Sequence, residues 1–597
     1  MSSYKAPLDD LRFAIHDVLG AEALLARLGY ADANRELIDA VLDEAARFSE
    51  TVLAPLNQIG DEVGCKYDPA SGDVTPPPGF KQAFQQFVEG GWTGLTNDPE
   101  HGGQGMPALL GSAVTEMVDS GNLAWSNFPM LSHGAVKALE TYGEDWQKEV
   151  FLKPLVGGTW TGTMCLTEPH CGTDLGLLKT RAEPQADGSY AITGTKIFIT
   201  AGEHDLVPNI IHLVLAKLPD APPGAKGISL FVVPKFKVDR DGKVGERNAL
   251  RCGAIEHKMG IHGSATCVMN FDGAQGYLVG QPHKGLQAMF VMMNTARLAV
   301  GIQGLGLSER AYQNALRYAR ERLQSRALSG AKFPDKAADP IIVQPDVRRM
   351  LLAQKALVEG ARLLSLSAYA QLDIAQRSPD AAERERAETL VGFLTPICKA
   401  CLTEWSIENT YNAVQCFGGH GYIAEHGMEQ LARDARITTL YEGTTGIQSL
   451  DLIGRKTAAT QGAGLKLFLA EIEAFARQHE GDAALAEFLV PLRAKCAEWG
   501  KLTLDTVMRA ASNPEELGAA STDYLFYSGY VALAYWWTRA VAAADASDRP
   551  QAFKDAKRAT ARFYFARILP RTLSHKAAIE SGAETLMALP AEAFGAE

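Results

Sequence analysis

The stretch RDARITTLYEGTTGIQSLDLIGRK, residues 433–456, places a carboxylate beside a run of small residues. Glu442 follows the aromatic Tyr441 and precedes residues 443–446, which are Gly, Thr, Thr and Gly. Such small neighbours leave space on one side, so a ligand can approach the carboxylate closely. An apolar ligand would raise the pKa of this group towards the range of a general base. Because most glutamates in turns are only solvated, the rest of the chain must decide whether Glu442 is functional.

The composition is that of an ordinary globular protein with several domains. A chain of 597 residues is too long for one core and predicts roughly three to five domains. The formal net charge of −12 argues against a nucleic-acid-binding surface. Nine cysteines without a disulfide framework indicate a reducing compartment and predict a cytoplasmic protein. We find no signal-peptide pattern and no stretch of about 20 uninterrupted apolar residues, so no integral membrane segment is expected.

The order of patterns along the chain predicts a multidomain, mainly α protein with a central β domain. Helical spacing from Leu37 to Val52 is followed by Pro55, where the helix is expected to end. Pro- and Gly-rich runs predict loops at residues 68–79 and 96–107. Between about residues 161 and 284, short β-branched runs separated by turns predict strands. The clearest of these are residues 189–201, 209–217, 227–234 and 265–271.

Helical periodicity returns after Gly285. We expect helices over residues 289–322, from residue 346, over about residues 388–416 and from about Gly446, and these four suggest a bundle. Residues 457–597 are again helical, with breaks near Gly481 and Asn513. The predicted boundaries are an N-terminal extension (1–34), an N-terminal helical domain (35–160), a middle β domain (161–284), a helical bundle (285–456) and a C-terminal helical domain (457–597).

Three further stretches have the composition of ligand-binding loops. In TMCLTEPHCGTDLGL, residues 163–177, an apolar run ends at Thr167 and leads into a glycine-rich turn that can offer N–H groups to a ligand. KIFITAG, residues 196–202, predicts a strand on which Phe198 can lie against a planar group. QCFGGHGY, residues 415–422, has paired glycines at the end of a helix. Each stretch alone is common in proteins without such a site.

Together, in this order and spacing, the four stretches closely resemble the acyl-CoA dehydrogenase family of flavoenzymes. The resemblance covers about residues 35–456 and implies the family's fold: an N-terminal helical domain, a β-barrel-like middle domain and a four-helix bundle. The pattern YxAPLxDxRF from Tyr4 to Phe13 and the added C-terminal helical domain are similar to one subfamily. That subfamily contains 3-methylmercaptopropionyl-CoA dehydrogenases and related bacterial enzymes that act on fatty acyl-CoA.

The resemblance implies FAD-dependent dehydrogenation of an acyl-CoA to a trans-2-enoyl-CoA. Glu442 matches the family's catalytic base, which removes a proton from Cα of the thioester while a hydride passes from Cβ to the flavin. The backbone N–H of Glu442 and a ribityl hydroxyl of FAD would stabilise the developing enolate charge. The expected substrate is a fatty acyl-CoA or 3-methylthiopropanoyl-CoA, and the expected electron acceptor is an electron-transfer flavoprotein.

The same match implies contacts to the cofactor and the substrate. The residues expected to bind FAD are Leu166, Thr167, Thr173, Phe198, Ile199, Thr200, Arg322, Gln324, Gln415, Gly418, Gly419, Thr444, Gly446 and Gln448. Five of them would contact the FAD of a neighbouring subunit: Arg322, Gln324, Gln415, Gly418 and Gly419. A homodimer is therefore the smallest expected assembly. The residues expected to bind the substrate are Thr173, Asn294, Arg297 and Gly443.

The chain departs from the family's pattern at several positions. Cys171 and Leu177 replace the small residues usual in the first loop, and Asn294 stands where an acidic residue is common. Ala296 occupies the position at which isovaleryl-type relatives carry an alternative base. The resemblance therefore points again to Glu442 as the base.

Two other functions remain open at this stage. With O2 as the acceptor, the same fold would make the chain an acyl-CoA oxidase. A flavoprotein of this fold that binds DNA is the other alternative, and the acidic net charge argues against it.

Three other patterns are better explained by packing than by chemistry. Cys398 and Cys401 form a CxxC in the middle of a predicted helix, without a second pair at metal-binding spacing. GIQGLG, residues 301–306, follows no strand and is expected to let helices pack closely. The aromatic cluster between Tyr524 and Trp537 is predicted to form the core of the C-terminal domain.

Overall fold

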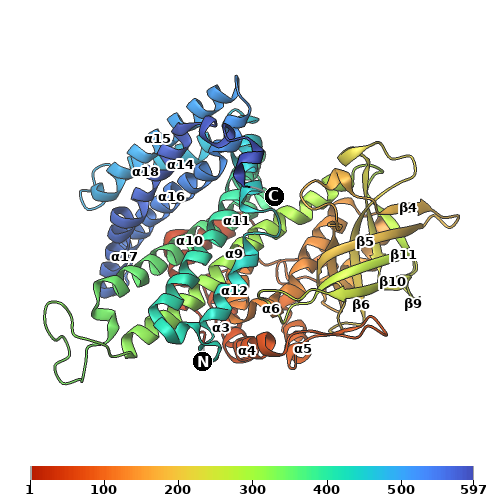
Figure 1. The fold of residues 1–597 in the computed structure, drawn as a ribbon, viewed down its shortest axis with the longest axis horizontal. Coiled ribbons are helices and arrows are strands. Elements are labelled where there is room, and N and C mark those ends of the chain that lie inside the picture. Colours follow the sequence, from red (N-terminus) through yellow and green to blue (C-terminus); the bar gives the residue numbers. More distant parts are fainter. Residues whose placement is uncertain (1–2, 596–597) are drawn as a thin grey trace. The chain divides into compact units, whose positions relative to one another are not determined.

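A computed structural model describes residues 3–595 of the chain, which form two compact units (Figure 1). Among the described residues, the helical unit comprises 3–46, Pro107–Ser120 and 300–595, and the barrel unit comprises Arg47–Met106 and Gly121–Ala299. Residues 1 and 2 of the predicted N-terminal extension and residues 596 and 597 of the predicted C-terminal domain lie outside the described part.

The barrel unit contains a closed ring of five strands. Strand β11 pairs with β5, β5 with β4, β4 with β6, β6 with β7, and β7 again with β11. β3 extends the ring in parallel beside β6, and β10 lies antiparallel to β11. This closure confirms the expected β-barrel-like domain. The strands are β3 (Trp160–Cys165), β4 (Arg181–Pro184), β5 (Tyr190–Thr200), β6 (Asn209–Lys217), β7 (Ile228–Pro234), β10 (Leu250–Ile255) and β11 (Thr266–Val279).

The predicted strands agree with the structure except at the end of β11. The strand predicted for residues 209–217 is β6 without change, and β5 and β7 each lie within one residue of their predicted ends. β11 was predicted to end at Phe271 but continues for eight more residues, to Val279, because the chain does not turn at Gly273. With φ at 74°, Gly273 lies where the register of β11 against β5 shifts, and the strand then continues to pair with β7. Two short antiparallel pairs complete the β structure: β1 (Lys66–Tyr67) with β2 (Val74–Thr75), and β8 (Phe236–Val238) with β9 (Val244–Arg247).

The N-terminal part of the chain is helical, as predicted, but Pro55 does not end a helix. The chain continues from α3 through the π-helical turn Ser49–Leu53 into α4, where Pro55 lies in the first turn. Proline is tolerated there because an N–H at that position has no partner within the helix. The helices are α1 (Leu8–Arg12), α2 (Ala21–Arg27), α3 (Arg35–Phe48), α4 (Ala54–Val63), α5 (Phe80–Glu89), α6 (Ala108–Tyr142), α7 (Asp145–Gln147) and α8 (Lys153–Val156).

The four helices expected for the bundle are present. The fourth begins at Thr445, close to the predicted start, and after six residues it continues as the π-helical turns Asp451–Ala458. An additional helix, α12, precedes it and was not predicted, because the glycines around residue 420 indicated only a turn. The helices are α9 (Gly285–Glu321), α10 (Pro345–Arg377), α11 (Ala381–Phe417), α12 (Met428–Thr438) and α13 (Thr445–Leu450).

Glycines let α9 approach α11 closely, as the sequence predicted. A Cβ atom added at Gly301 would lie 3.0 Å from the carbonyl oxygen of Cys398, and one at Gly304 would lie 2.7 Å from that of Leu402. Cys398 and Cys401 are both buried in α11, where burial raises the pKa of the Cys398 thiol to about 12. Within residues 3–595 no group of three or more His, Cys, Asp or Glu side chains could hold a metal ion.

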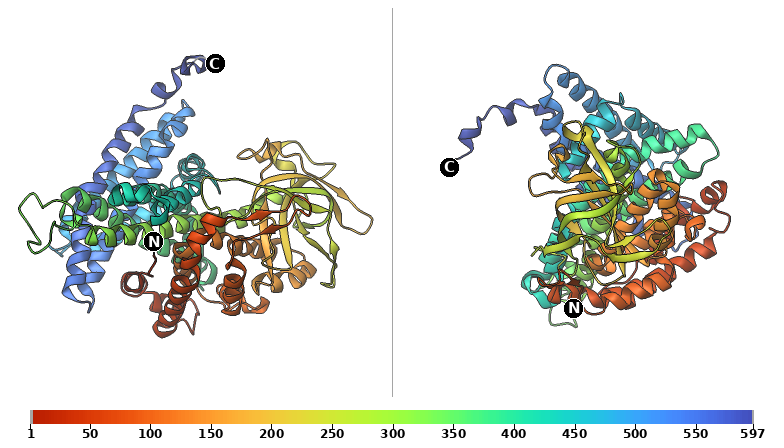
Figure 2. Two further views of the ribbon diagram at one scale, coloured as in Figure 1. Left: turned by 60° about the horizontal axis from the view of Figure 1, so that its bottom comes forward. Right: turned by 90° about the vertical axis from the view of Figure 1, so that its right-hand side faces the viewer.

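The C-terminal helices pack beside the bundle helices, with the blue helices along the green ones in Figure 2. As predicted, the aromatic cluster forms their core: Tyr524, Tyr527 and Trp537 of α16 are fully buried. By length and composition, one helical stretch of the described chain, Ala381–Tyr422, could cross a membrane, and 78% of its apolar window is buried in the protein. The helices are α14 (Ala463–Gln478), α15 (Ala486–Ala510), α16 (Glu515–Ala546), α17 (Gln551–Phe563), α18 (Thr572–Ser581) and α19 (Glu584–Met587).

A buried charge network connects the N-terminal segment to the C-terminal helices. The carboxylate of Asp10 pairs with Arg362 of α10 and with Lys557 of α17. Arg362 is almost fully buried and also binds Glu116 of α6, with 2.9 Å between its Nε and Oε1, and Glu309 of α9. Burial raises the pKa of Asp10, but Lys557 and Arg362 together hold it below the usual range.

Candidate active site

Glu442 lies in a turn between α12 and α13, here called the Glu442 turn and comprising residues 439–446. Its φ angle is 57°, and that of Gly443 is 89°, so two consecutive residues are left-handed. For a residue with a Cβ atom this conformation costs about 1–2 kcal/mol. The surrounding structure must therefore hold the turn in place.

Side chains from two helices hold the carbonyl groups of this turn. Gln448 of α13 donates from Nε2 to the carbonyl oxygen of Glu442 over 3.0 Å. Lys399 of α11 donates from Nζ to the carbonyl oxygen of Gly443 over 2.7 Å. A Cβ atom added at Gly443 would lie 2.6 Å from Nε2 of Gln448 and would displace this donor, and the φ of 89° also favours glycine at this position.

The side chains that flank Glu442 are also anchored. The hydroxyl of Tyr441 donates to Gln303 of α9, and that of Thr445 donates to Glu404 of α11 over 2.5 Å. Burial raises the pKa of Tyr441 well above its usual value, and the carboxylate of Glu442 adds to this effect. The Thr444 hydroxyl caps α13 by accepting from a backbone N–H in its first turn. The helical unit thus brings the predicted residues Glu442, Gly443, Thr444, Gly446 and Gln448 together.

In the barrel unit, the two predicted loops lie side by side. Ile197 donates its N–H to the carbonyl oxygen of Thr167 over 2.9 Å, and Lys196 donates from Nζ to that of Leu166 over 2.9 Å. Phe198 follows with a left-handed φ of 59° and is 60% exposed. The predicted residues Leu166, Thr167, Phe198, Ile199 and Thr200 are thereby gathered on neighbouring segments of the same unit.

The first of these loops is folded around the buried carboxylate of Glu168. This carboxylate accepts from Lys196 Nζ over 2.9 Å, from the Thr180 hydroxyl over 2.6 Å and from the Lys179 N–H over 2.7 Å. Burial raises the pKa of Glu168, but Lys196 and these donors outweigh it and hold the pKa below its usual range. Thr173 lies in the same loop and is exposed.

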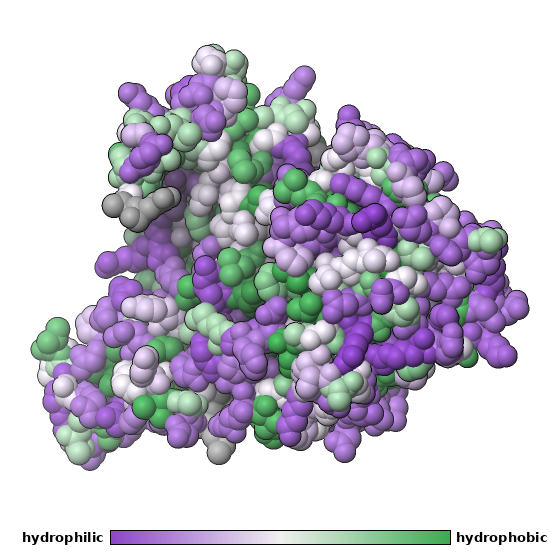
Figure 3. Space-filling model, turned by 45° about the vertical axis from the view of Figure 1, so that its right-hand side comes forward, coloured by the Kyte–Doolittle hydropathy of each residue, from purple (hydrophilic) through white to green (hydrophobic). Residues whose placement is uncertain are grey.

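An exposed aromatic ring stands out on this unit. Hydrophilic residues cover most of the barrel surface seen in Figure 3. Phe198 combines a ring open to solvent with a left-handed backbone conformation that is uncommon for a residue with a Cβ atom.

The predicted substrate residues of α9 lie in its first half, within the barrel unit. Asn294 is exposed and Arg297 is 6% exposed. Nη1 of Arg297 lies 3.4 Å from Oδ1 of Asn294, one turn away along the helix. Asn294 can therefore orient the guanidinium without neutralising its charge.

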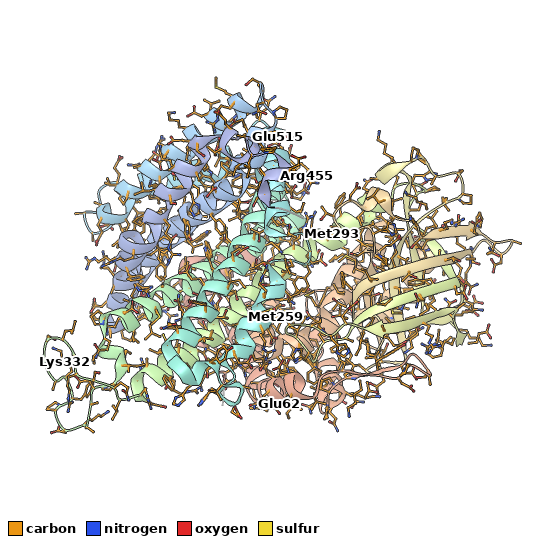
Figure 4. All side chains as sticks on the ribbon, in the orientation of Figure 1. Glu62, Met259, Met293, Lys332, Arg455 and Glu515 are labelled. Carbon is orange, nitrogen blue, oxygen red and sulfur yellow. The ribbon has the colours of Figure 1, made fainter. Side chains whose placement is uncertain are left out.

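The exposed residues Arg322 and Gln324 begin the loop between α9 and α10, in which Lys332 is labelled in Figure 4. The Gln324 N–H donates to the carbonyl oxygen of Asp339 over 3.0 Å. The Asp339 carboxylate in turn accepts backbone N–H groups from the loop, including that of Phe333 over 2.8 Å. Burial raises the pKa of Asp339, but these donors lower it to about 2. An ionised carboxylate therefore organises this loop.

Gln415, Gly418 and Gly419 lie exposed at the end of α11, where Gly418 is the cap, as predicted. Gly418 has φ 59° and ψ −140°, which only glycine adopts readily. A Cβ atom added at either glycine would meet no atom within 4 Å. The backbone is thus open to close approach by a ligand.

The residues present in each unit fit the cofactor expected from the sequence. The amide oxygen of Gln448 is buried and has no hydrogen-bond donor among residues 3–595, so it can accept from a bound group. The barrel unit offers an exposed ring at Phe198 beside the hydroxyls of Thr167 and Thr200, and the helical unit offers an open glycine pair. A flat cofactor with hydrogen-bonding edges and an anionic tail, such as FAD, matches these features.

Sequence reasoning missed two residues, Lys196 as the partner of Glu168 and Lys399 as the donor to Gly443. Both are fully buried. The sequence feature that could have indicated them is a lysine next to an apolar run. IFIT follows Lys196, and PIC precedes Lys399. A lysine at such a position needs a buried acceptor.

Comparison with known families accounts for most of the chain. Four family models match: "Acyl-CoA dehydrogenase, N-terminal domain" over residues 36–159, "middle domain" over 163–274 and "C-terminal domain" over 283–457, and "Acetyl-CoA dehydrogenase C-terminal like" over 468–590.

Two curated relatives are similar over almost their whole length. The chain is 41% identical to 3-methylmercaptopropionyl-CoA dehydrogenase of Ruegeria pomeroyi, over 98% of this chain and 99% of that protein. It is 35% identical to a butyryl-CoA dehydrogenase of Syntrophomonas wolfei, over 99% of each chain.

Among solved structures, Caenorhabditis elegans ACDH-11 in complex with C11-CoA has the same fold, with a TM-score of 0.77 and 18% identity over 94% of this chain and 91% of that one. The motifs, the barrel between helical segments and the full-length similarity lead to one conclusion: the chain belongs to the acyl-CoA dehydrogenase family of FAD-dependent oxidoreductases.

Proposed function

We propose that this enzyme dehydrogenates short acyl-CoA thioesters between Cα and Cβ, with Glu442 as the base. The preferred substrate is 3-methylmercaptopropionyl-CoA or a straight-chain acyl-CoA of similar length. The carboxylate of Glu442 takes the proton from Cα, and the backbone N–H of Glu442 donates to the thioester carbonyl, where negative charge develops.

The observation that carries this proposal is the strained, anchored conformation of Glu442. A solvated glutamate would need neither a left-handed φ of 57° nor donors to the carbonyls of residues 442 and 443. Strain of this kind persists where it serves a site, because it fixes the direction of a side chain in advance.

The other proposed residues bind and orient. Leu166, Thr167, Phe198 and Thr200 would hold the ring system of FAD, and Arg297 would lie near the substrate. When bound, FAD supplies the hydride acceptor for Cβ. The residues Thr173, Ile199, Arg322, Gln324, Gln415, Gly418, Gly419, Thr444, Gly446 and Gln448 would complete cofactor binding, and Thr173, Asn294 and Gly443 would contribute to the substrate site.

The substrate proposal rests on two of the full-length relatives. One is named for 3-methylmercaptopropionyl-CoA and the other for butyryl-CoA. The two acyl groups have chains of similar length and differ mainly in a thioether sulfur. We therefore expect one narrow pocket that accepts both.

We further propose an electron-transfer flavoprotein as the acceptor, a homodimer as the smallest assembly and a cytoplasmic location. The open glycine pair at the end of α11 and the exposed Arg322 and Gln324 support the dimer, because they can reach a cofactor bound by another copy. All nine cysteines are free thiols, which agrees with a reducing compartment.

Anaerobic flavin reduction tests the proposal. The holoenzyme is mixed with propionyl-, butyryl-, hexanoyl-, palmitoyl- and 3-methylmercaptopropionyl-CoA, and bleaching of the flavin absorbance is followed. The highest kcat/KM is expected for the butyryl and methylmercapto substrates. Absence of bleaching with all five in an FAD-replete sample would overturn the proposed reaction, and turnover in air with stoichiometric peroxide would replace the flavoprotein acceptor by O2.

A further inference from the structure

Lys399 is an unusual residue for the middle of a core helix. It lies in α11 with no exposed surface, and its ammonium group donates to the carbonyl oxygen of Gly443 over 2.7 Å. Removing an ammonium group from water costs several kcal/mol, so a lysine here needs strong acceptors. In return, a charge-assisted hydrogen bond is roughly twice as strong as a neutral one.

The backbone from which Lys399 projects has little freedom. A Cβ atom added at Gly301 of α9 would lie 3.5 Å from Cα of Lys399, so the two helices are in close contact at this residue. The Thr403 hydroxyl donates to the carbonyl oxygen of Lys399 over 2.8 Å. The ammonium group is therefore presented from a rigid site.

The acceptor of this bond belongs to the residue directly after Glu442. Gln448 holds the peptide between Glu442 and Gly443, and Lys399 holds the next peptide, between Gly443 and Thr444. With two consecutive peptide planes held, the φ and ψ angles of Gly443, the residue between them, are restricted as well. The first of these planes carries the carbonyl of Glu442, so holding it restricts the ψ angle of Glu442 and with it the direction in which that side chain leaves the backbone.

We propose that Lys399 is a positioning residue of the dehydrogenation reaction: it holds the Gly443 carbonyl and thereby aims the Glu442 carboxylate at the substrate. The inference rests on the proposed role of Glu442 as the base. In this role, Lys399 acts through the Gly443 carbonyl and does not contact the reacting atoms. Its effect is on the geometry of proton removal, for which a displacement of about 1 Å can cost 100-fold in rate.

The direct test compares Lys399→Met with Thr410→Val. The control removes a hydroxyl that is also buried in α11, about three turns further along, and that donates to the carbonyl oxygen of Ser406 within the same helix. In Lys399→Met we expect flavin reduction by butyryl-CoA to be about 10- to 100-fold slower, with binding of an unreactive thioether analogue unchanged. Thr410→Val should keep the wild-type rate. Equal rates in both variants would overturn the inference.

Lys399→Gln separates positioning from a general packing defect. It retains a donor without the charge, so an intermediate rate is expected if the bond to Gly443 matters. If Lys399→Gln is as slow as Lys399→Met, altered packing around the shorter side chain explains the loss, and this result would also count against the inference. If Lys399→Met does not fold, Lys399→Gln takes its place in the comparison.

A double-mutant cycle tests whether Lys399 acts through Glu442. In a Glu442→Gln background, Lys399→Met should cause no further loss of rate, whereas independent effects would multiply. If Glu442→Gln alone keeps wild-type activity, the proposed base is wrong. If Glu442→Gln is inactive and Lys399→Met is as active as the control, only the role of Lys399 is wrong.

Hydrogen exchange gives a measurement that does not depend on activity. In the apoprotein, peptides that cover residues 439–448 should exchange faster in Lys399→Met than in the wild type, while those of the barrel unit keep their rates. Thr410→Val should leave the exchange of residues 439–448 unchanged. Unchanged exchange in Lys399→Met would overturn the proposal.

Discussion

Two buried lysines, one in each unit, support the candidate site residues of that unit in different ways. In the barrel unit, Lys196 pairs with the carboxylate of Glu168 and also donates to the carbonyl oxygen of Leu166. In the helical unit, Lys399 donates to the carbonyl oxygen of Gly443, beside the base. The first lysine stabilises a loop built around an ion pair, and the second fixes the direction of a turn.

This difference predicts different consequences when each region is changed. The loop around Glu168 is held by a buried ion pair and by donors from the same unit, so its loss should affect stability and cofactor retention. The carbonyl groups of Glu442 and Gly443 are held by Gln448 of α13 and Lys399 of α11, so losing one of these donors should affect the rate while the fold persists. The predictions below test this separation, in order of decreasing effect.

The largest effect is expected for Glu442→Gln. Without a base at Cα, flavin reduction by butyryl-CoA should be slower by about 10⁴-fold. FAD content and Tm should stay close to wild type, because the amide has the size and shape of the carboxylate. Glu425→Gln, an exposed change in the same unit, serves as the control. Loss of FAD in Glu442→Gln would contradict the proposed separation.

Lys196→Met should have the largest effect on stability. It leaves the Glu168 carboxylate buried without its cation, which costs about 3–5 kcal/mol. We expect a lower Tm and loss of FAD on gel filtration, in contrast to the effect of Glu442→Gln. Lys179→Met is the matched control, since its side chain is exposed and only its backbone N–H binds Glu168. A variant that keeps both FAD and Tm would show that the ion pair is dispensable.

The Glu168 pair also predicts a pH dependence. Because the folded state holds the pKa of Glu168 below its unfolded value of about 4.3, the pair stabilises the protein above that pH. Its contribution is lost as the pH falls through the folded pKa. The difference in unfolding free energy between wild type and Glu168→Gln should therefore shrink from pH 6 towards pH 3.5. A constant difference would mean that the carboxylate does not titrate with folding.

A smaller effect is expected for Gln448→Leu. The change removes the donor to the Glu442 carbonyl, a bond worth about 1–1.5 kcal/mol. Flavin reduction should be roughly tenfold slower, since 1.4 kcal/mol corresponds to a factor of ten. Stopped-flow measurement on FAD-replete samples checks this. The control is Thr457→Val, a buried change in the π-helical turns after α13, and it should keep the wild-type rate.

The smallest effect on stability is expected for Phe198→Ala. Because the ring is 60% exposed, its removal should change the unfolding free energy of the apoprotein by no more than about 0.5 kcal/mol. The affinity for FAD should nevertheless fall, as measured by flavin fluorescence on titration. Phe565→Ala of the C-terminal helices is a suitable comparison, because it should leave FAD binding unchanged. An unchanged affinity in Phe198→Ala would exclude the ring from the cofactor site.

Much of the architecture could be predicted because local patterns decide it. The apolar run of β6 and the breaks around α15 are visible in the sequence, and so is the aromatic core of α16. The end of β11 was not predicted. Asp272 and Gly273 form an Asp-Gly pair, which is found both in turns and at bulges within a strand. Pro55 was misjudged for a similar reason, since proline fits the first turn of a helix as well as the end of the one before.

The sequence predicted the motifs of the candidate site, but it did not predict the interactions that hold these motifs in place. The position of Glu442 followed from the resemblance, whereas its left-handed conformation did not, because nothing in the local sequence requires it. The role of Lys399 depends on α11 lying beside the Glu442 turn, 44 residues along the chain. Contacts over such separations appear only once the helices are packed.

The pairing of Asp10 with Lys557 has a consequence for how the protein is made. These residues are 547 positions apart, so Asp10 is synthesised long before Lys557. At about 5–20 residues per second, that delay is about half a minute to two minutes. Asp10 can pair with Arg362 as soon as α10 has been made, but it lacks Lys557 for the rest of this time. A chain released before Lys557 is added would therefore leave the carboxylate of Asp10 without its second cation.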